Sequence, residues 1–240
     1  MILHDLLEKD IFTSLKNKLS VADVWSERPL TGVTNNPKFK NNKEYIGEQL
    51  VEEYCLMNEV QNNILWREYV AAPKQSSRTI FLRYDQNNHY KKHTDTSKGF
   101  DGALHYTNIY FISDPEEYEG GEFCLKINEE VFKYKLKKNS LLTYPINTEH
   151  WVTPIIKGVR YVGIFWTQSY INQEEDRRML RELTQINRLV MDYIESNLNN
   201  GDHITDHELA EVTIKLENIA ERINQKYPRY RGGECPLISE

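Results

Sequence analysis

Two histidines and one aspartate in this sequence have the residue types and spacing of a metal site. His93 and Asp95 lie two positions apart within HYKKHTDTSKGF, residues 89–100, which follows a run of β-forming residues. If a strand runs through 90–95, both side chains point to the same face, because side chains alternate along a strand. His150, at the start of another expected strand, is the candidate for a third ligand.

This set of donors points to one kind of chemistry. Two imidazoles and one carboxylate on one face leave open positions on a bound metal, which suits Fe(II) oxygen chemistry rather than a closed structural zinc site. The pattern His-x-Asp often arises by chance, however, so a polar turn is the alternative interpretation. The surrounding sequence has to decide between the two.

A β-rich core would position these residues. Short β-branched or aromatic segments, separated by turn sequences, predict strands over 77–84, 104–113, 121–127, 130–136, 139–145, 149–155 and 160–169. A series of this kind indicates an antiparallel sandwich or barrel. The spacing of apolar residues predicts helices over 5–19, 44–66, 173–198 and 203–224, the last with Thr205 or Asp206 as its N-cap.

The composition is that of a polar, acidic chain. Its 240 residues carry a formal net charge of −6 with a pI near 5.7, so we expect no nucleic-acid partner. No apolar run is long enough to cross a membrane, and the first residues, MILHDLLEKDIF, lack the pattern of a signal peptide. Three widely spaced cysteines, Cys55, Cys124 and Cys235, form no CxxC pair, which favours a reducing, cytoplasmic location.

Several stretches of the chain resemble a known enzyme family. Residues 81–95, FLRYDQNNHYKKHTD, resemble the signature RY-x-x-G-x-x-Y-x-x-H-x-D of prolyl-4-hydroxylase-like 2-oxoglutarate and Fe(II)-dependent oxygenases. The stretches at 40–42, 113–122 and 165–169 are similar to the KNN, SDP-x-x-Y-x-GGE and FW-x-QS segments of the bacterial PKHD-type hydroxylases. The similarity covers about residues 1–225 and is densest over 80–170.

One position departs from the signature. The family has glycine where this chain has Asn87, three residues after Tyr84. Glycine would serve a turn that needs a positive φ, and asparagine is the next most tolerant residue, so we expect the turn to be kept. The loop 96–104 is expected to differ most from relatives and to border the substrate opening.

The resemblance implies a mainly β fold with flanking helices, of the α+β class. Its core would be a double-stranded β-helix, or jelly roll, at about 76–170. The implied organisation is a dioxygenase domain over 1–172 with N-terminal helices in 1–75, a C-terminal helical extension over 173–226, and an irregular tail over 227–240.

The resemblance also implies a role for each candidate ligand. His93, Asp95 and His150 would bind Fe(II). Arg160 would hold the far carboxylate of 2-oxoglutarate, because arginine offers a permanent charge and a two-point contact. No separate catalytic residue is expected beyond the metal ligands.

Other residues would line the pocket of the cosubstrate. Tyr84 would donate its hydroxyl to the same carboxylate, and Trp166 would form a wall of the pocket. For each of these two, an ordinary core residue is the alternative interpretation. Ile109 and Phe111 share one strand face and would line the apolar side.

The implied activity is Fe(II)- and 2-oxoglutarate-dependent hydroxylation of a substrate C–H bond, with release of succinate and CO2. The substrate would be a protein, a peptide or a small molecule, and a prolyl residue is the usual acceptor in the family. Ascorbate is a candidate additional reductant, and a homodimer is left open.

Two alternative functions remain. One is a cupin-like zinc or manganese enzyme, which would not need Arg160 or Tyr84; the other is a non-enzymatic jelly-roll binding module.

Overall fold

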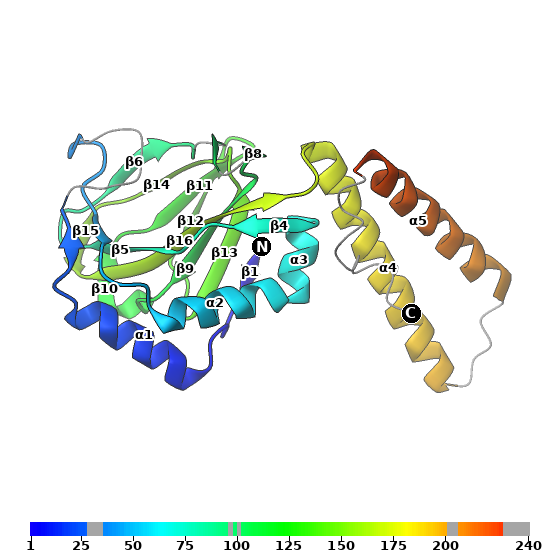
Figure 1. The fold of residues 1–240 in the computed structure, drawn as a ribbon, viewed down its shortest axis with the longest axis horizontal. Helices are drawn as coiled ribbons and strands as arrows, with labels where there is room; N and C mark the ends of the chain where they lie inside the picture. Colours follow the sequence, from blue (N-terminus) through cyan, green and yellow to red (C-terminus); the bar gives the residue numbers. More distant parts are fainter. Residues whose placement is uncertain (28–35, 96–97, 100–101, 201–205, 228–240) are drawn as a thin grey trace. The chain divides into compact units, whose positions relative to one another are not determined.

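The computed structural model describes residues 1–27, 36–95, 98–99, 102–200 and 206–227 (Figure 1). The chain forms two compact units: unit 1 comprises Met1–Trp66 and Gln75–Gln168, and unit 2 comprises Arg67–Lys74 and Ser169–Glu240. Each unit contains its own cluster of buried apolar side chains. Among the helices of the described residues, none has the length and apolar character needed to cross a membrane.

Two antiparallel sheets form the core of unit 1. The larger sheet has the strand order β1-β13-β9-β16-β5-β3-β2, and β4 also pairs with β16. Its strands are β1 (Ile2–Leu3), β2 (Trp25–Ser26), β3 (Lys43–Tyr45), β4 (Pro73–Ser76), β5 (Ile80–Tyr84), β9 (Tyr106–Phe111), β13 (Ser140–Pro145) and β16 (Arg160–Ser169). The smaller sheet has the order β12-β11-β14-β6, with β6 (Tyr90–His93), β11 (Phe123–Ile127), β12 (Glu130–Tyr134) and β14 (Glu149–Val152).

Short segments complete the strands of this unit. The ribbon β10 (Tyr118–Gly120) pairs with β15 (Ile155–Gly158), and β7 (Lys98–Gly99) pairs with β8 (Gly102–Ala103). A single 3₁₀ turn, η1 (Pro115–Glu117), leads into β10.

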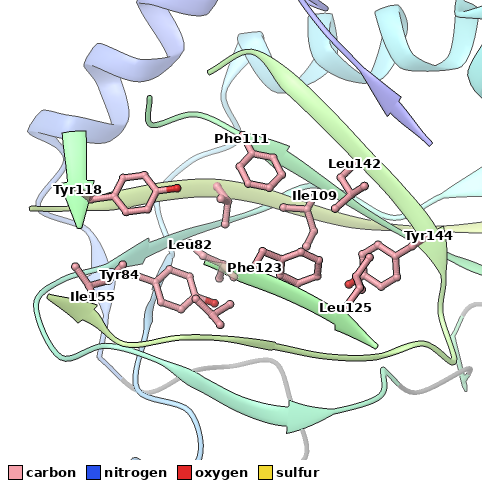
Figure 2. Packing of buried hydrophobic residues seen from close by; sticks show 12 residues of the cluster. Leu82, Tyr84, Ile109, Phe111, Tyr118, Phe123, Leu125, Leu142, Tyr144 and Ile155 are labelled. Carbon is pink, nitrogen blue, oxygen red and sulfur yellow. The ribbon is translucent and has the colours of Figure 1, made fainter. Parts of the chain in front are cut away.

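Alternation along the strands places apolar side chains between the two sheets (Figure 2). Val162 on the central strand β16 lies opposite Phe111 of β9 on one side and Leu82 of β5 on the other. Phe123 and Leu125 of the smaller sheet pack into the same cluster. The architecture is therefore the mainly β, jelly-roll core with flanking helices that the family resemblance implies.

Helices cover the outer face of the larger sheet. They are α1 (Lys9–Val21), α2 (Val51–Asn62) and α3 (Ile64–Val70). The ring of Phe12 on α1 packs edge-on against Tyr110 of β9, with ring centroids 6.5 Å apart. Trp66 on α3 donates from Nε1 to Oδ1 of the buried Asn108 at 3.0 Å. Tyr110 and Asn108 alternate with the residues of β9 that face the core, so one strand serves both layers.

Unit 2 contains a pair of long helices, α4 (Glu174–Asn200) and α5 (Asp206–Lys226). Its buried apolar cluster consists of Ala71, Ala72, Ile171, Leu180, Leu183 and Ile223. Near the start of α4, Asp176 accepts a hydrogen bond from Lys226 at 2.5 Å and another from the hydroxyl of Tyr227. These bonds join the end of α5 to the beginning of α4.

Most of the expected elements are present. The seven expected strands correspond to β5, β9, β11, β12, β13, β14 and β16, and the two expected C-terminal helices correspond to α4 and α5. Thr205, Cys235 and the tail from residue 228 lie outside the described residues. The domain boundary expected after residue 172 stays a prediction.

Two expected helices were wrong in their extent. The helix expected over 44–66 begins only at Val51, because Lys43 and Glu44 pair as strand β3 with β5. It is also divided into α2 and α3 at Asn63, whose Oδ1 accepts a hydrogen bond from the backbone N–H of Trp66 at 3.0 Å. The first helix begins at Lys9 instead of residue 5, because the backbone N–H groups of Leu6 and Leu7 donate to the carbonyl and Oδ1 of Asn139. In both places, hydrogen bonds to a distant segment override a local helical pattern.

The turn between β5 and β6 keeps the geometry expected for the family's glycine. Asn87 has a φ of 67°, and its backbone N–H donates to the carbonyl of Ile155 at 2.8 Å. The left-handed conformation costs asparagine less than most other residues, because its short polar side chain can bond locally. The prediction that Asn87 preserves a positive-φ turn is confirmed.

Candidate functional site

The three candidate ligands converge inside unit 1. His93 ends β6, and His150 on β14 is its direct partner across the smaller sheet. Asp95 follows two residues beyond the end of β6, so the strand expected over 90–95 stops at His93, although the carboxylate still reaches the same place. Asp95 Oδ1 is 3.7 Å from Nε2 of each histidine. The ligand atoms of all three residues lie within 4.8 Å of one another.

Backbone carbonyls orient both imidazoles. Nδ1 of His93 bonds to the carbonyl of Lys91 at 2.7 Å, and Nδ1 of His150 bonds to that of Thr148 at 2.9 Å. A carbonyl can only accept, so each Nδ1 carries the proton and each Nε2 keeps its lone pair. Nε2 of His93 is buried and has no hydrogen-bond partner among the described residues. This is the arrangement by which proteins prepare histidines as metal ligands.

The carboxylate of Asp95 is oriented in a similar way. Its Oδ2 accepts a hydrogen bond from the hydroxyl of Thr107 at 2.7 Å and another from Nε1 of Trp166 at 2.9 Å. These two donors leave Oδ1 directed to the histidines. Sequence reasoning missed Thr107, although the alternation that places Ile109 on the inner face of β9 places Thr107 there too.

Burial favours the neutral form of His93. Desolvation lowers the pKa of His93 to about 4, and the adjacent His150 acts in the same direction. His93 is therefore neutral at neutral pH, and a metal need not displace a proton from it.

A cavity of about 460 Å³ extends from the candidate ligands to Arg160. Arg160 is the first residue of β16 and is only 1 % exposed. None of its three guanidinium nitrogens has a hydrogen-bond partner among the described residues. The guanidinium instead lies 5.2 Å from the ring of Tyr84 and 5.6 Å from that of Phe111. A buried, permanently charged group without a partner is costly, so this end of the cavity suits an anionic ligand.

The other expected pocket residues lie around this cavity. Tyr84, whose buried ring is labelled in Figure 2, is the strand partner of Arg160 across β5 and β16. Burial raises the pKa of its hydroxyl to about 12, so that it stays protonated as a donor. Ile109 and Trp166 line the cavity, whereas Phe111 packs against Arg160 instead.

Lys40 is a cavity residue that sequence reasoning did not single out. It is 4 % exposed, lines the cavity and forms an ion pair of 2.8 Å with the equally buried Glu44. Lys40 also forms an isolated bridge with Tyr90 of β6, so it belongs to the surroundings of the candidate ligands.

Comparisons with known proteins agree with this geometry. The family model described as "2OG-Fe(II) oxygenase superfamily" matches residues 79–168. A PKHD-type hydroxylase of Aliarcobacter butzleri is 32% identical over 230 residues, which cover 90% of this chain and 100% of that protein.

Two solved structures share the fold. A prolyl-4-hydroxylase of Pseudomonas putida has a TM-score of 0.54 at 13% identity, covering 70% of this chain and 91% of that one. HygX of Streptomyces hygroscopicus, determined with nickel, 2-oxoglutarate and hygromycin B bound, has a TM-score of 0.53 at 13% identity, covering 70% and 82%. The relative matched over its full length and the family model agree with this fold. The chain therefore belongs to the 2OG-Fe(II) oxygenase superfamily and, within it, to the PKHD-type hydroxylases.

Proposed function

We propose that this oxygenase, whose cofactors are Fe(II) and 2-oxoglutarate, hydroxylates a C–H bond of its substrate through a centre held by His93, Asp95 and His150. The observation that carries the proposal is the buried guanidinium of Arg160, which lacks a partner among the described residues and lines the same cavity as the triad. An anion that reaches from the metal ligands to Arg160 would satisfy both ends of the cavity.

The residues present fit the two groups. Two neutral imidazoles and one carboxylate form the donor set of non-haem Fe(II) sites. Arg160 and the protonated hydroxyl of Tyr84 fit a carboxylate, because one supplies charge and paired donors and the other a further donor. When bound, Fe(II) and 2-oxoglutarate supply the oxidising chemistry that uses O2 and releases succinate and CO2.

The protein's own contribution is orientation and shielding. Thr107 and Trp166 hold Asp95 in one orientation, and the backbone bonds of both histidines fix their Nε2 atoms. Apolar side chains such as Ile109 and Val162 line the cavity and limit the access of water. Such pre-organisation removes the need to reorder these groups during the reaction.

The acceptor is the open part of the proposal. The Pseudomonas putida structure is a prolyl-4-hydroxylase, and the HygX structure holds hygromycin B, so the fold serves acceptors of different chemistry. We propose a prolyl residue in a protein or peptide as the acceptor to test first. Assistance by ascorbate, a cytoplasmic location and a homodimer stay predictions from the sequence.

A spectroscopic titration tests the proposal. Wild-type protein mixed with Fe(II) and 2-oxoglutarate without O2 should show weak visible absorption from metal-to-ligand charge transfer, and with O2 it should form succinate. His150→Ala should abolish both signals. The matched control is His4→Ala, which changes an exposed histidine just after β1 and should keep both signals. Absence of the absorption in metal-loaded wild-type protein would refute the oxygenase chemistry.

A cupin-like zinc or manganese enzyme is the second candidate. It would use the same three ligands but would have no need for a buried cation at the position of Arg160. The unpartnered guanidinium is therefore the observation that disfavours it. Zinc-dependent turnover without consumption of 2-oxoglutarate would reverse this preference.

A further inference from the structure

A buried ion pair lies beside β6, the strand that carries His93. Lys40 and Glu44 are 2.8 Å apart, with side chains only 4% and 2% exposed. A pair of this kind contributes little net stability, because removing both charges from water costs about as much as their attraction returns. Folding stability therefore does not explain why these two charges are buried. The residues in contact with Lys40 point to a role in the candidate metal site.

The backbone around Lys40 is tied to the strand that carries His93. Lys40 bridges to Tyr90, and the N–H of Lys91 donates to the carbonyl of Phe39 at 2.9 Å. Asn41 accepts from the N–H of His89 through its Oδ1 at 2.7 Å. On its other side β6 pairs with β14, so it is held from both sides.

Side-chain contacts also connect Lys40, through the ring of Tyr90, to His93. The rings of Tyr90 and His93 stack with centroids 3.6 Å apart and an interplanar angle of 21°. The ammonium of Lys40 lies 5.1 Å from the centroid of Tyr90, within the range of a cation–π contact. Phe39 meets both rings edge-on, at 5.8 Å for Tyr90 and 6.3 Å for His93.

We propose that Tyr90 is a positioning residue that fixes the plane of the His93 imidazole, and that the buried pair Lys40–Glu44 holds Tyr90 in place. The bond from Nδ1 of His93 to Lys91 restrains the ring at one atom and leaves rotation about that bond. The stacked phenol of Tyr90 removes this freedom, so that Nε2 stays directed to the metal. This inference rests on the proposed function, because it takes His93 as a metal ligand.

The test measures the affinity for Co²⁺, used as a probe, by competition with a chelator on the full-length protein. Tyr90→Leu removes the stacked ring and should weaken Co²⁺ binding about tenfold, as loss of outer partners of metal ligands commonly does. Tyr90→Phe keeps the ring and should bind within about twofold of wild type. The doubly neutral Lys40→Met/Glu44→Gln variant preserves the net charge and should weaken binding several-fold.

The matched control is Lys126→Met/Glu129→Gln, which removes an ion pair of 2.6 Å whose glutamate is 87% exposed. It should leave the Co²⁺ affinity unchanged. Unfolding of the metal-free variants is measured alongside, because a purely structural role would lower stability without changing the affinity of the folded protein. If Tyr90→Leu does not fold, the Lys40/Glu44 double variant decides alone.

The outcomes separate this inference from the function on which it rests. If wild type and His150→Ala bind Co²⁺ equally, the proposed metal site itself fails. If wild type binds through the triad but Tyr90→Leu or the double variant binds equally well, the positioning role is refuted. A double variant that loses 2-oxoglutarate affinity but keeps Co²⁺ affinity would also refute it, since Lys40 would then be a ligand-binding residue.

Discussion

At the scale of single residues, the proposed role of Arg160 as the partner of an anionic ligand can be tested separately from its effect on the fold. Arg160→Met removes a buried charge that has no hydrogen-bond partner among the described residues, so the ligand-free protein should become about 1–3 kcal/mol more stable. The same change should abolish the rise in melting temperature that 2-oxoglutarate causes in wild type. Thermal unfolding with and without 2-oxoglutarate measures both effects. A variant that is less stable and still responds to 2-oxoglutarate would contradict this role.

The sequence predicted the site unevenly. His93 and Asp95 occupy defined positions of a spaced signature, and the family resemblance assigned roles to His150 and Arg160. Lys40 lies in the stretch 40–42 that resembles the family, but its place in the cavity could not be predicted, because its position beside β6 depends on a bridge to Tyr90 that spans the intervening helices and strands. A contact of this kind is set by tertiary pairing and cannot be predicted from the spacing of residues along the sequence.

At the scale of elements, the turn between β5 and β6 can be tested directly. Asn87→Ala should lower the free energy of unfolding by about 1 kcal/mol, because alanine keeps the Cβ that is crowded at a φ of 67° but loses the polar side chain that eases this conformation for asparagine. Asn87→Gly should change it by less than about 0.5 kcal/mol, because glycine adopts this φ without strain. Denaturant unfolding of the two variants measures the difference. Equal effects would mean that the side chain of Asn87 matters more than its backbone conformation.

The helix pair of unit 2 should respond to acid. Hydrogen bonds from Lys226 and Tyr227 hold the pKa of Asp176 below its usual value. A carboxylate with a lowered folded pKa contributes stability above the unfolded value, near 3.8, and loses it as the pH falls through the folded pKa. Hydrogen exchange of α5 should therefore be slower in wild type than in Asp176→Asn at pH 5, and this difference should be smaller at pH 3, below the unfolded pKa.

A matched control for this experiment is Asp192→Asn, which changes an exposed carboxylate farther along α4. It should leave the exchange of α5 unaltered at both pH values. Exchange rates of wild type and Asp176→Asn that agree at pH 5 would show that the contact with Lys226 does not hold the helices together.

Elements with strong internal patterns were the predictable ones. β16 was expected over its full range, Arg160–Ser169, because ten residues of β-forming sequence leave little choice. β1, β2 and β3 were missed, because two or three residues are too few to show an alternating pattern of apolar and polar side chains. Such short strands form only by hydrogen bonding to a neighbouring strand. β3 was expected as part of a helix for the same reason.

At the scale of the whole molecule, the two units should respond differently to ligands. The candidate ligands and Arg160 all lie in unit 1. Co²⁺ and 2-oxoglutarate at about 100 times their dissociation constants should stabilise that unit by about 2.7 kcal/mol each. Hydrogen exchange should then slow in β5, β6, β14 and β16, and stay unchanged in α4 and α5. Equal protection of the helices would show that the units unfold together.

The position of β16 has a consequence for how the chain is made. β16 lies between β9 and β5 in the larger sheet, yet it is the last strand of that sheet to leave the ribosome. At about 5–20 residues per second, β5 waits several seconds for its neighbour after it has been synthesised. Throughout that interval the nascent sheet has an open seam at its centre. The strand that closes the seam also carries Arg160 and Trp166, so the newly made protein gains its proposed anion-binding group at the moment its principal sheet becomes continuous.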